Sequence, residues 1–200
     1  MRPSEVESRL RRALAVPAAA TTDYDLNPGS APPPRGLRPA AVLCAVDLTG
    51  AEARVILTKR SAQLRHHPGQ IAFPGGKLDA GEDVVAGALR EAAEEIGLPT
   101  GQAEVLGTFG PHETVTGFSI MATRALLHEP FVAVPQAGEV AEVFGVPLAH
   151  LARLDRYRVD GRRWQGYLRR YWVVPYGPYY VWGATARLLR GLAERLEAVR

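Results

Sequence analysis

The sequence contains one cysteine, Cys44, among its 200 residues. A single thiol excludes an internal disulfide framework and gives no zinc site, so we expect Cys44 to lie in a core strand as a small apolar residue. No apolar run reaches the roughly 20 residues that a membrane-spanning helix needs. The N-terminus, MRPSEVESRLRRALAV, is charged throughout and lacks the apolar segment of a signal peptide. These features predict a cytoplasmic protein without a membrane partner.

The chain also lacks a strong charge of either sign. Its 24 basic and 21 acidic residues give a net charge of +3, which is too weak to indicate a nucleic-acid-binding protein. A hydrophobic content of 46% and a charged content of 22% are normal for a globular protein with a sizeable core. The length predicts one domain with small additions.

Hydrophobic periodicity and turn residues predict a mixture of strands and helices. An amphipathic helix is expected at residues 4–16, followed by an Ala/Pro-rich stretch to residue 38 that wraps the domain or forms an extended linker. Strands are expected at 39–48, at 53–60, on either side of a turn at Pro111-His112, and at 139–148. A short helix, a last β section with a hairpin turn at Asp160-Gly161 and a final helix at about 182–199 complete the pattern.

Residues 76–98, GKLDAGEDVVAGALREAAEEIGL, read as a helix with marked ends. Asp79 followed by Glu82 matches a capping box, and Gly97 before Pro99 indicates where the helix ends. Its apolar side chains fall on one stripe that is expected to face the core, namely Val85, Leu89, Ala92 and Ile96.

Three acids of this helix, Glu91, Glu94 and Glu95, are spaced i, i+3 and i+4 and therefore share one patch. The rotation per residue places the patch roughly opposite the apolar stripe. Arg90 is the one cation of the helix after Lys77 and cannot neutralise three carboxylates. A hard divalent cation such as Mg²⁺ or Mn²⁺ would do so, although on spacing alone a solvated acidic face is the more common outcome.

The whole stretch matches the pattern G-x5-E-x7-R-E-U-x-E-E-x-G-U, in which U is apolar. The fixed positions are Gly76, Glu82, Arg90, Glu91, Ala92, Glu94, Glu95, Gly97 and Leu98. This pattern resembles the Nudix box, the metal-binding motif of hydrolases that cleave a diphosphate linked to another moiety.

The resemblance implies an α/β fold, a Nudix-type α/β/α sandwich with a mixed sheet, and covers roughly residues 40–148. We accordingly divide the chain into an N-terminal helix with a wrapping segment, residues 1–38, and a Nudix hydrolase domain, residues 39–200. The resemblance also implies that Glu91, Glu94 and Glu95 hold Mg²⁺ or Mn²⁺, helped by a backbone carbonyl near Gly75 or Gly76. Arg90 and Glu82 would then support the helix and orient Glu91.

A second pattern, L-L-T-x-[RT]-[SA]-x3-R-x3-G-x3-F-P-G-G, fits residues 56–76, with isoleucine in place of the first leucine. It resembles the signature that precedes the Nudix box in coenzyme A diphosphatases. Arginine forks suit phosphate oxygens, and glycines let the backbone approach a ligand. The expected substrate-binding residues are Lys59, Arg60, Arg65, Gly69, Phe73 and Gly75. The alternative is a solvated Lys-Arg pair in a turn-rich loop.

Further residues are weaker candidates. Beside a motif for a hard metal, His66 and His67 are expected to contact phosphate or to occupy ordinary loop positions rather than to ligate metal. His112 and Glu113 are candidates for the edge of a pocket. Glu139 is a better candidate than Glu142 for an extra metal ligand or base, against the alternative of an ordinary exposed acid. The aromatic run at 172–182 is expected to pack the last helix rather than to bind adenine.

Together these features predict a metal-dependent hydrolase that cuts coenzyme A into 4′-phosphopantetheine and adenosine 3′,5′-bisphosphate. Two alternatives stay open: a Nudix hydrolase for ADP-ribose, NADH or a nucleoside triphosphate, and a non-catalytic, nucleotide-sensing Nudix module. The sequence does not identify the general base, the number of metal ions or the physiological form of coenzyme A. It also leaves the oligomeric state open, with a homodimer allowed.

Overall fold

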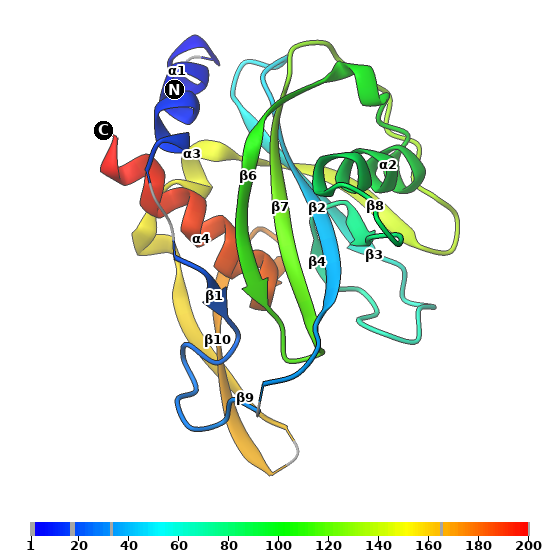
Figure 1. Cartoon of the computed structure of the whole chain (residues 1–200). Coiled ribbons are helices and arrows are strands. Elements are labelled where there is room, and N and C mark those ends of the chain that lie inside the picture. The colour runs from blue at the N-terminus through cyan, green and yellow to red at the C-terminus, as the bar shows by residue number, and fades with distance from the viewer. Residues whose placement is uncertain (1–2, 17–18, 33, 165, 200) are drawn as a thin grey trace.

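The structure is a computed structural model that describes residues 3–16, 19–32, 34–164 and 166–199 (Figure 1). A mixed sheet lies between α2 (Val84–Ile96) on one face and three helices on the other: α1 (Pro3–Leu14), α3 (Leu148–Leu151) and α4 (Gly183–Ala198). The predicted α/β/α arrangement is confirmed. Among the described residues, no helix combines the length and apolarity that crossing a membrane requires.

The central sheet has the strand order β1-β6-β7-β2-β3-β4, with β5 paired to β2 and β8 paired to β3. Its strands are β1 (Thr21–Thr22), β2 (Arg38–Asp47), β3 (Arg54–Arg60), β4 (Ile71–Ala72), β5 (Gly75–Lys77), β6 (Ala103–Glu113), β7 (Phe118–Leu127) and β8 (Val140–Pro147). β2 runs parallel to β7, and β1 runs parallel to β6, whereas the other pairs are antiparallel. The long β2–β7 pairing places β2 inside the sheet, which suits its nearly continuous apolar sequence.

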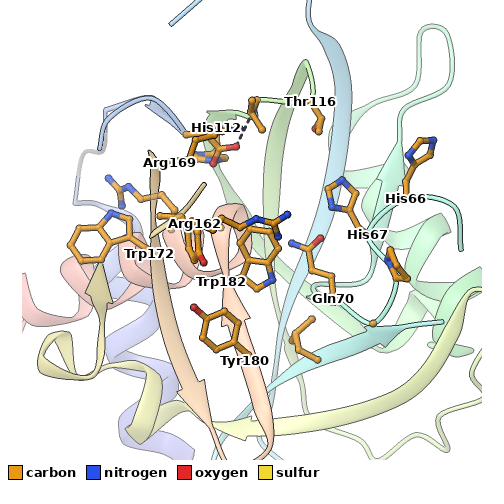
Figure 2. Close-up of a pocket in the computed structure, with 18 of the residues that line it drawn as sticks. His66, His67, Gln70, His112, Thr116, Arg162, Arg169, Trp172, Tyr180 and Trp182 are labelled. Atoms are coloured by element: carbon orange, nitrogen blue, oxygen red, sulfur yellow. Dashed lines mark hydrogen bonds and ion pairs between the residues drawn. The ribbon is translucent and has the colours of Figure 1, made fainter. Parts of the chain in front are cut away.

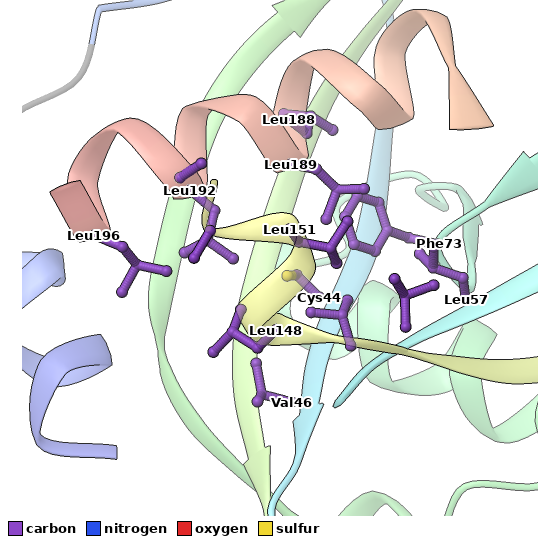
Figure 3. Close-up of a cluster of buried hydrophobic side chains, with 14 of the residues drawn as sticks. Cys44, Val46, Leu57, Phe73, Leu148, Leu151, Leu188, Leu189, Leu192 and Leu196 are labelled. Atoms are coloured by element: carbon purple, nitrogen blue, oxygen red, sulfur yellow. The ribbon is translucent and has the colours of Figure 1, made fainter. Parts of the chain in front are cut away.

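Side chains of β2 alternate between two buried clusters. Leu43 faces the α2 side, whereas Cys44 and Val46 face the α4 side, where Figure 3 draws Val46 beside Leu148. The Cys44 side chain is fully buried, as expected, and its burial raises the pKa of the thiol to about 12.

The N-terminal helix belongs to the α4-side cluster. Val6, Leu10 and Ala13 of α1 are buried in it, and the Arg9 guanidinium donates two hydrogen bonds to the Leu196 carbonyl of α4. The helix expected at residues 4–16 is therefore confirmed to within two residues at its C-terminal end. The domain boundary at residue 38 stays a prediction.

Two predicted turns are wrong. β6 continues through Pro111 and His112, and the chain reverses at residues 114–117, where the Gly117 amide donates to the Thr114 carbonyl over 3.0 Å. The strand accommodates Pro111 at a register shift, where its missing N–H breaks no ladder hydrogen bond.

The second wrong turn is Asp160-Gly161. These residues lie inside an antiparallel three-stranded sheet formed by β9 (Arg158–Trp164), β10 (Tyr167–Tyr176) and β11 (Tyr179–Trp182). The Asp160 carboxylate accepts hydrogen bonds from the Gly161 amide and the Tyr180 hydroxyl, each over 2.8 Å. The Asp-Gly pair thus stabilises a strand contact, and β9 runs on to Trp164.

Candidate functional site

Helix α2 begins four residues later than the capping box predicts. Its N-cap is Asp83, whose carboxylate accepts hydrogen bonds from the Val85 amide at 2.9 Å and the Ala86 amide at 3.2 Å. Glu82 does reach back to the Asp79 amide, over 3.0 Å, but this contact closes a turn that precedes the helix. The predicted end is confirmed, because Gly97 has a left-handed φ of 69° and its amide donates to Ala92 and Ala93.

Arg90 organises three of the predicted site residues. Its guanidinium donates to both carboxylate oxygens of Glu82, at 2.8 and 2.9 Å, and this pair lowers the pKa of Glu82 to about 2. The Nη1 atom of Arg90 also donates to Glu91 at 3.1 Å and to Glu94 at 3.2 Å. Arg90 is thus anchored by Glu82 and holds the carboxylates of Glu91 and Glu94.

Glu95 departs from the prediction that the acidic patch lies opposite the apolar stripe. It is 4% exposed, and its carboxylate accepts the Gly75 amide at 3.0 Å. The Arg60 guanidinium lies 4.0 Å from the other carboxylate oxygen. Burial raises the pKa of Glu95 to about 7 despite the opposing effects of the Gly75 amide and Arg60. Glu95 therefore lies at the edge of the core, whereas Glu94 is exposed.

Two glycines of the patterns fit tightly against neighbouring groups. Gly75 has a φ of 151°, and a Cβ there would meet the Ala41 carbonyl oxygen at 2.4 Å. A Cβ on Gly76 would meet the Glu91 carboxylate at 2.5 Å. Both positions need glycine for close approach, which brings β5 directly under the acids of α2.

Sequence reasoning missed Gly87, which lies inside α2. A Cβ at this position would come within 2.2 Å of Leu78 and 3.0 Å of the Glu82 carboxylate. A glycine within a helical pattern costs about 1 kcal/mol relative to alanine, so its presence was the available signal for a close contact.

Glu139 comes to the same patch from the segment before β8. Its charge raises the pKa values of both Glu91 and Glu95, although burial is the larger cause for each. The Glu139 carbonyl accepts the Ser61 amide over 2.7 Å, which ties this segment to the signature loop. Glu139 is thus near enough to the box acids for its charge to act on them, and its role as an extra ligand or base stays a prediction.

These carboxylates fit a hard divalent cation. Glu91, Glu94, Glu95 and Glu139 offer only oxygen donors, which suit Mg²⁺ or Mn²⁺. Burial is the main cause of the raised pKa values of Glu91 and Glu95, and the charges of neighbouring glutamates add to it. A bound divalent cation would stabilise the ionised forms.

A tighter acidic group occurs elsewhere. Among the described residues, Glu7, Glu104 and His128 form the group whose metal-ligand atoms all lie within 4.8 Å of one another. Arg11 already pairs with both of these glutamates, and His128 pairs with Glu104 at 2.9 Å. This group is an exposed ion-pair network that joins α1 to the sheet.

The signature segment divides between two faces of the sheet. Arg60 of β3 faces α2 and approaches Glu95, whereas the adjacent Lys59 lines a cavity on the α4 side. Arg65 and Gly69 line the same cavity. Phe73 is 3% exposed and packs in the α4-side cluster, so its side chain belongs to the core, and its predicted contact with substrate stays a prediction.

The cavity has a volume of about 830 Å³ and lies between the signature loop, residues 22–26 and the sheet β9–β11 (Figure 2). His66, His67 and His112 line it, whereas Glu113 is not among its lining residues. His112 is fully buried and contacts the Thr21 hydroxyl at 2.9 Å and the Asp23 carboxylate at 3.3 Å.

The aromatic run has two roles. Trp172, Tyr176 and Tyr179 pack against the α4-side core, as expected. The prediction of packing alone is incomplete, because Tyr180 and Trp182 also line the cavity. The box glutamates do not line the cavity. Two consecutive residues connect the two regions, because Lys59 lines the cavity and Arg60 approaches Glu95.

The known proteins that are similar to this chain match the region that contains α2 and the signature segment. A family model described as the NUDIX domain matches residues 37–165. A relative from Citrobacter koseri, described as the uncharacterized Nudix hydrolase NudL, is 41% identical over 157 residues, covering 78% of this chain and 81% of the relative. A protein of the same description from Enterobacter sp. is 38% identical with the same coverage.

The crystal structure of a Nudix hydrolase from M. smegmatis, RenU, is also similar. It has a TM-score of 0.51 and 32% identity, and the match covers 59% of this chain and 75% of that chain. The matched family region contains α2 with all three box glutamates and the signature segment before it. The chain therefore belongs to the Nudix hydrolase family.

Proposed function

We propose that this chain hydrolyses the diphosphate of coenzyme A, or of a coenzyme A derivative, to 4′-phosphopantetheine and adenosine 3′,5′-bisphosphate. One observation carries the choice of substrate: the coenzyme A diphosphatase-like signature is packed onto the Nudix box. Arg60 of the signature lies 4.0 Å from Glu95, and the Gly75 amide binds the same carboxylate at 3.0 Å.

In this proposal Glu91, Glu94 and Glu95 hold Mg²⁺ or Mn²⁺. When bound, such a cation supplies neutralisation of the diphosphate oxygens and makes a water molecule more acidic. Arg90 and Glu82 keep the Glu91 and Glu94 carboxylates in place through the contacts described above. The buried position of Glu95 excludes bulk water from one side of the patch.

Proton transfer needs a carboxylate near the attacking water. Glu139 is our first candidate, because it is exposed and its charge acts on both Glu91 and Glu95. Glu95 is the alternative, since it belongs to the same patch and the Gly75 amide holds its carboxylate in place. Substitution of Glu139 by Gln separates the two: a base contributes about 10²- to 10⁴-fold to the rate, and the loss should appear in kcat.

Substrate phosphates would meet the cations of the signature segment. Lys59 and Arg65 line the cavity and form no ion pair with the acidic residues that the structure describes. Their charges are therefore available for phosphate oxygens, and arginine can bind them with two parallel hydrogen bonds. The cytoplasmic location, the homodimer and the roles of Gly69 and Gly76 stay predictions.

The direct test is product analysis after incubation with coenzyme A and Mg²⁺ or Mn²⁺. We expect 4′-phosphopantetheine and adenosine 3′,5′-bisphosphate in equal amounts, and no reaction in the presence of a chelator. Cleavage of ADP-ribose or NADH without cleavage of coenzyme A would refute the proposed substrate and support the proposed reaction type. Tight nucleotide binding without cleavage of any diphosphate would refute the enzyme assignment and favour a sensing module.

A further inference from the structure

The cavity on the α4 side has two facing walls of different origin. One wall consists of side chains from β9–β11, of which β10 and β11 lie beyond the region matched by the family model. The other consists of the loop that precedes β4. Figure 2 shows Arg162, Tyr180 and Trp182 on one side of the space and His67 and Gln70 on the other.

The cavity carries an excess of positive charge. Six Lys and Arg side chains and three carboxylates line it, which gives an excess of three positive charges. The net charge of the whole chain is also +3. The six are Lys59, Arg65, Arg162, Arg169, Arg170 and Arg187. A concave site with one dominant sign of charge concentrates ligands of the opposite sign.

The three carboxylates already have partners. Asp23 contacts His112 and accepts the Val115 amide at 2.9 Å, and Asp25 lies 4.0 Å from Arg187. Glu142 accepts a hydrogen bond from the Tyr179 hydroxyl. Arg162, by contrast, forms no ion pair with any acid in the described part of the chain. Its charge is left for an anionic ligand.

Aromatic rings stand next to this free charge. The ring centroids of Tyr171 and Trp182 are 5.0 Å apart at an interplanar angle of 58°, and the Arg162 guanidinium lies 5.9 Å from the Trp182 ring centroid. The hydrogen bond from Tyr180 to Asp160 fixes a third ring, which is 40% exposed. Exposed aromatic faces beside arginine are the surfaces on which nucleobases stack.

The size of the cavity and its distance from the box glutamates suit a small-molecule site. Its volume of about 830 Å³ falls within the range of roughly 300–1,000 Å³ for small-molecule sites. Ile71 lines the cavity and the Gly75 amide binds Glu95, so the two regions are at most about 14 Å apart along four residues of chain. The proposal requires a substrate long enough to cover that distance.

We propose that this cavity binds an adenine nucleotide, with the base against the rings of Tyr171, Tyr180 and Trp182 and a ribose phosphate on Arg162. The inference rests on the proposed function, in which the ligand is the adenosine 3′-phosphate half of coenzyme A. It assigns to the C-terminal sheet a role in substrate selection, which the aromatic run alone did not predict.

The test uses two arginines of one strand. Arg162 lines the cavity, and neighbouring residues of a strand point to opposite faces, so the exposed Arg163 points away. Arg162→Ala and Arg163→Ala therefore remove the same charge from the same strand, and only the first removes it from the cavity. Binding of adenosine 3′,5′-bisphosphate to the full chain is measured by calorimetry without added metal.

We expect Arg162→Ala to raise the Kd for the bisphosphate by about 10- to 100-fold, as for the loss of a charge-assisted hydrogen bond. Arg163→Ala should stay within about twofold of wild type, since surface substitutions away from a contact have small effects. Adenosine without phosphate should bind wild type and Arg162→Ala alike. Inorganic phosphate should bind wild type more weakly than the bisphosphate does, because it cannot stack.

Three results would overturn the inference: no bisphosphate binding by wild type, equal weakening by the two substitutions, or inorganic phosphate that binds as tightly as the bisphosphate. The two proposals fail separately. Nucleotide binding that depends on Arg162 without hydrolysis of coenzyme A refutes the proposed function alone. Hydrolysis of coenzyme A with a kcat/KM that Arg162→Ala leaves unchanged refutes the assignment of the cavity alone.

Discussion

Replacement of Glu95 by Gln should stabilise the metal-free protein while it destroys activity. The Glu95 carboxyl has a pKa of about 7 in the folded chain against an ordinary value of 4.5, and burial is the main cause. A carboxyl whose pKa is raised by folding disfavours the folded state when it is ionised. The stability of wild type should therefore fall as pH rises from about 4.5 to 7.

The magnitude follows from the shift. A difference of about 2.5 pKa units corresponds to about 3 kcal/mol of unfolding free energy at pH 8. For a chain of this length that is a rise in Tm of roughly 6–12 °C for Glu95→Gln over wild type. Glutamine keeps an oxygen that can accept the Gly75 amide, so the hydrogen bond need not be lost.

The assay is thermal unfolding of both proteins in a chelator at pH 5 and pH 8. The gain of Glu95→Gln should shrink to about a quarter at pH 5, where Glu95 is protonated in the folded wild type. Mg²⁺ at pH 8 should raise the Tm of wild type more than that of the variant. A variant with the same Tm as wild type at pH 8 would refute the claim that Glu95 carries a buried, uncompensated charge.

Three further substitutions test other parts of the site. Glu94→Gln should lower turnover by orders of magnitude at saturating Mg²⁺, because it removes a proposed metal ligand. The fold should stay intact, because the Glu94 side chain is exposed. Retained turnover would contradict the role of Glu94 as a metal ligand. Arg65→Ala should lower kcat/KM for coenzyme A by about ten- to a hundredfold. If Arg65 binds the 3′-phosphate, the loss is confined to coenzyme A, whereas dephospho-coenzyme A suffers equally if it binds the diphosphate; no loss with either refutes the contact. Gly76→Ala should abolish activity in a folded protein, because its Cβ would lie 2.5 Å from the Glu91 carboxylate, and normal kcat would show that Glu91 need not keep this position.

Local patterns predicted the helix of the Nudix box well. The spacing of the acids and the glycine at position 97 depend only on helix geometry, and the structure confirms the helix and its C-terminal cap. The predicted start was wrong because Asp83, not Asp79, caps the helix: Asp83 accepts hydrogen bonds from two amides of the first turn, and Glu82 pairs with Arg90. The burial of Glu95 depends on β5, which packs against α2 only in the folded chain.

Long-range contacts explain the other differences. The cavity is assembled from the N-terminal segment, the signature loop and the C-terminal sheet, and no pattern within one of these segments shows that the three meet. The Asp-Gly pair at 160–161 has the composition of a turn, and the hydrogen bond that joins it to a neighbouring strand comes from Tyr180, 20 positions away. Period-2 alternation did contain one clue, since it places Lys59 and Arg60 on opposite faces of β3.

The most direct test of the substrate is the kcat/KM of wild type on coenzyme A, dephospho-coenzyme A, ADP-ribose and NADH, each measured with Mg²⁺ under one set of conditions. The signature segment and the cationic cavity predict the highest value for coenzyme A and a lower value for dephospho-coenzyme A, which lacks the 3′-phosphate. A higher value for ADP-ribose or NADH than for coenzyme A would contradict the assignment.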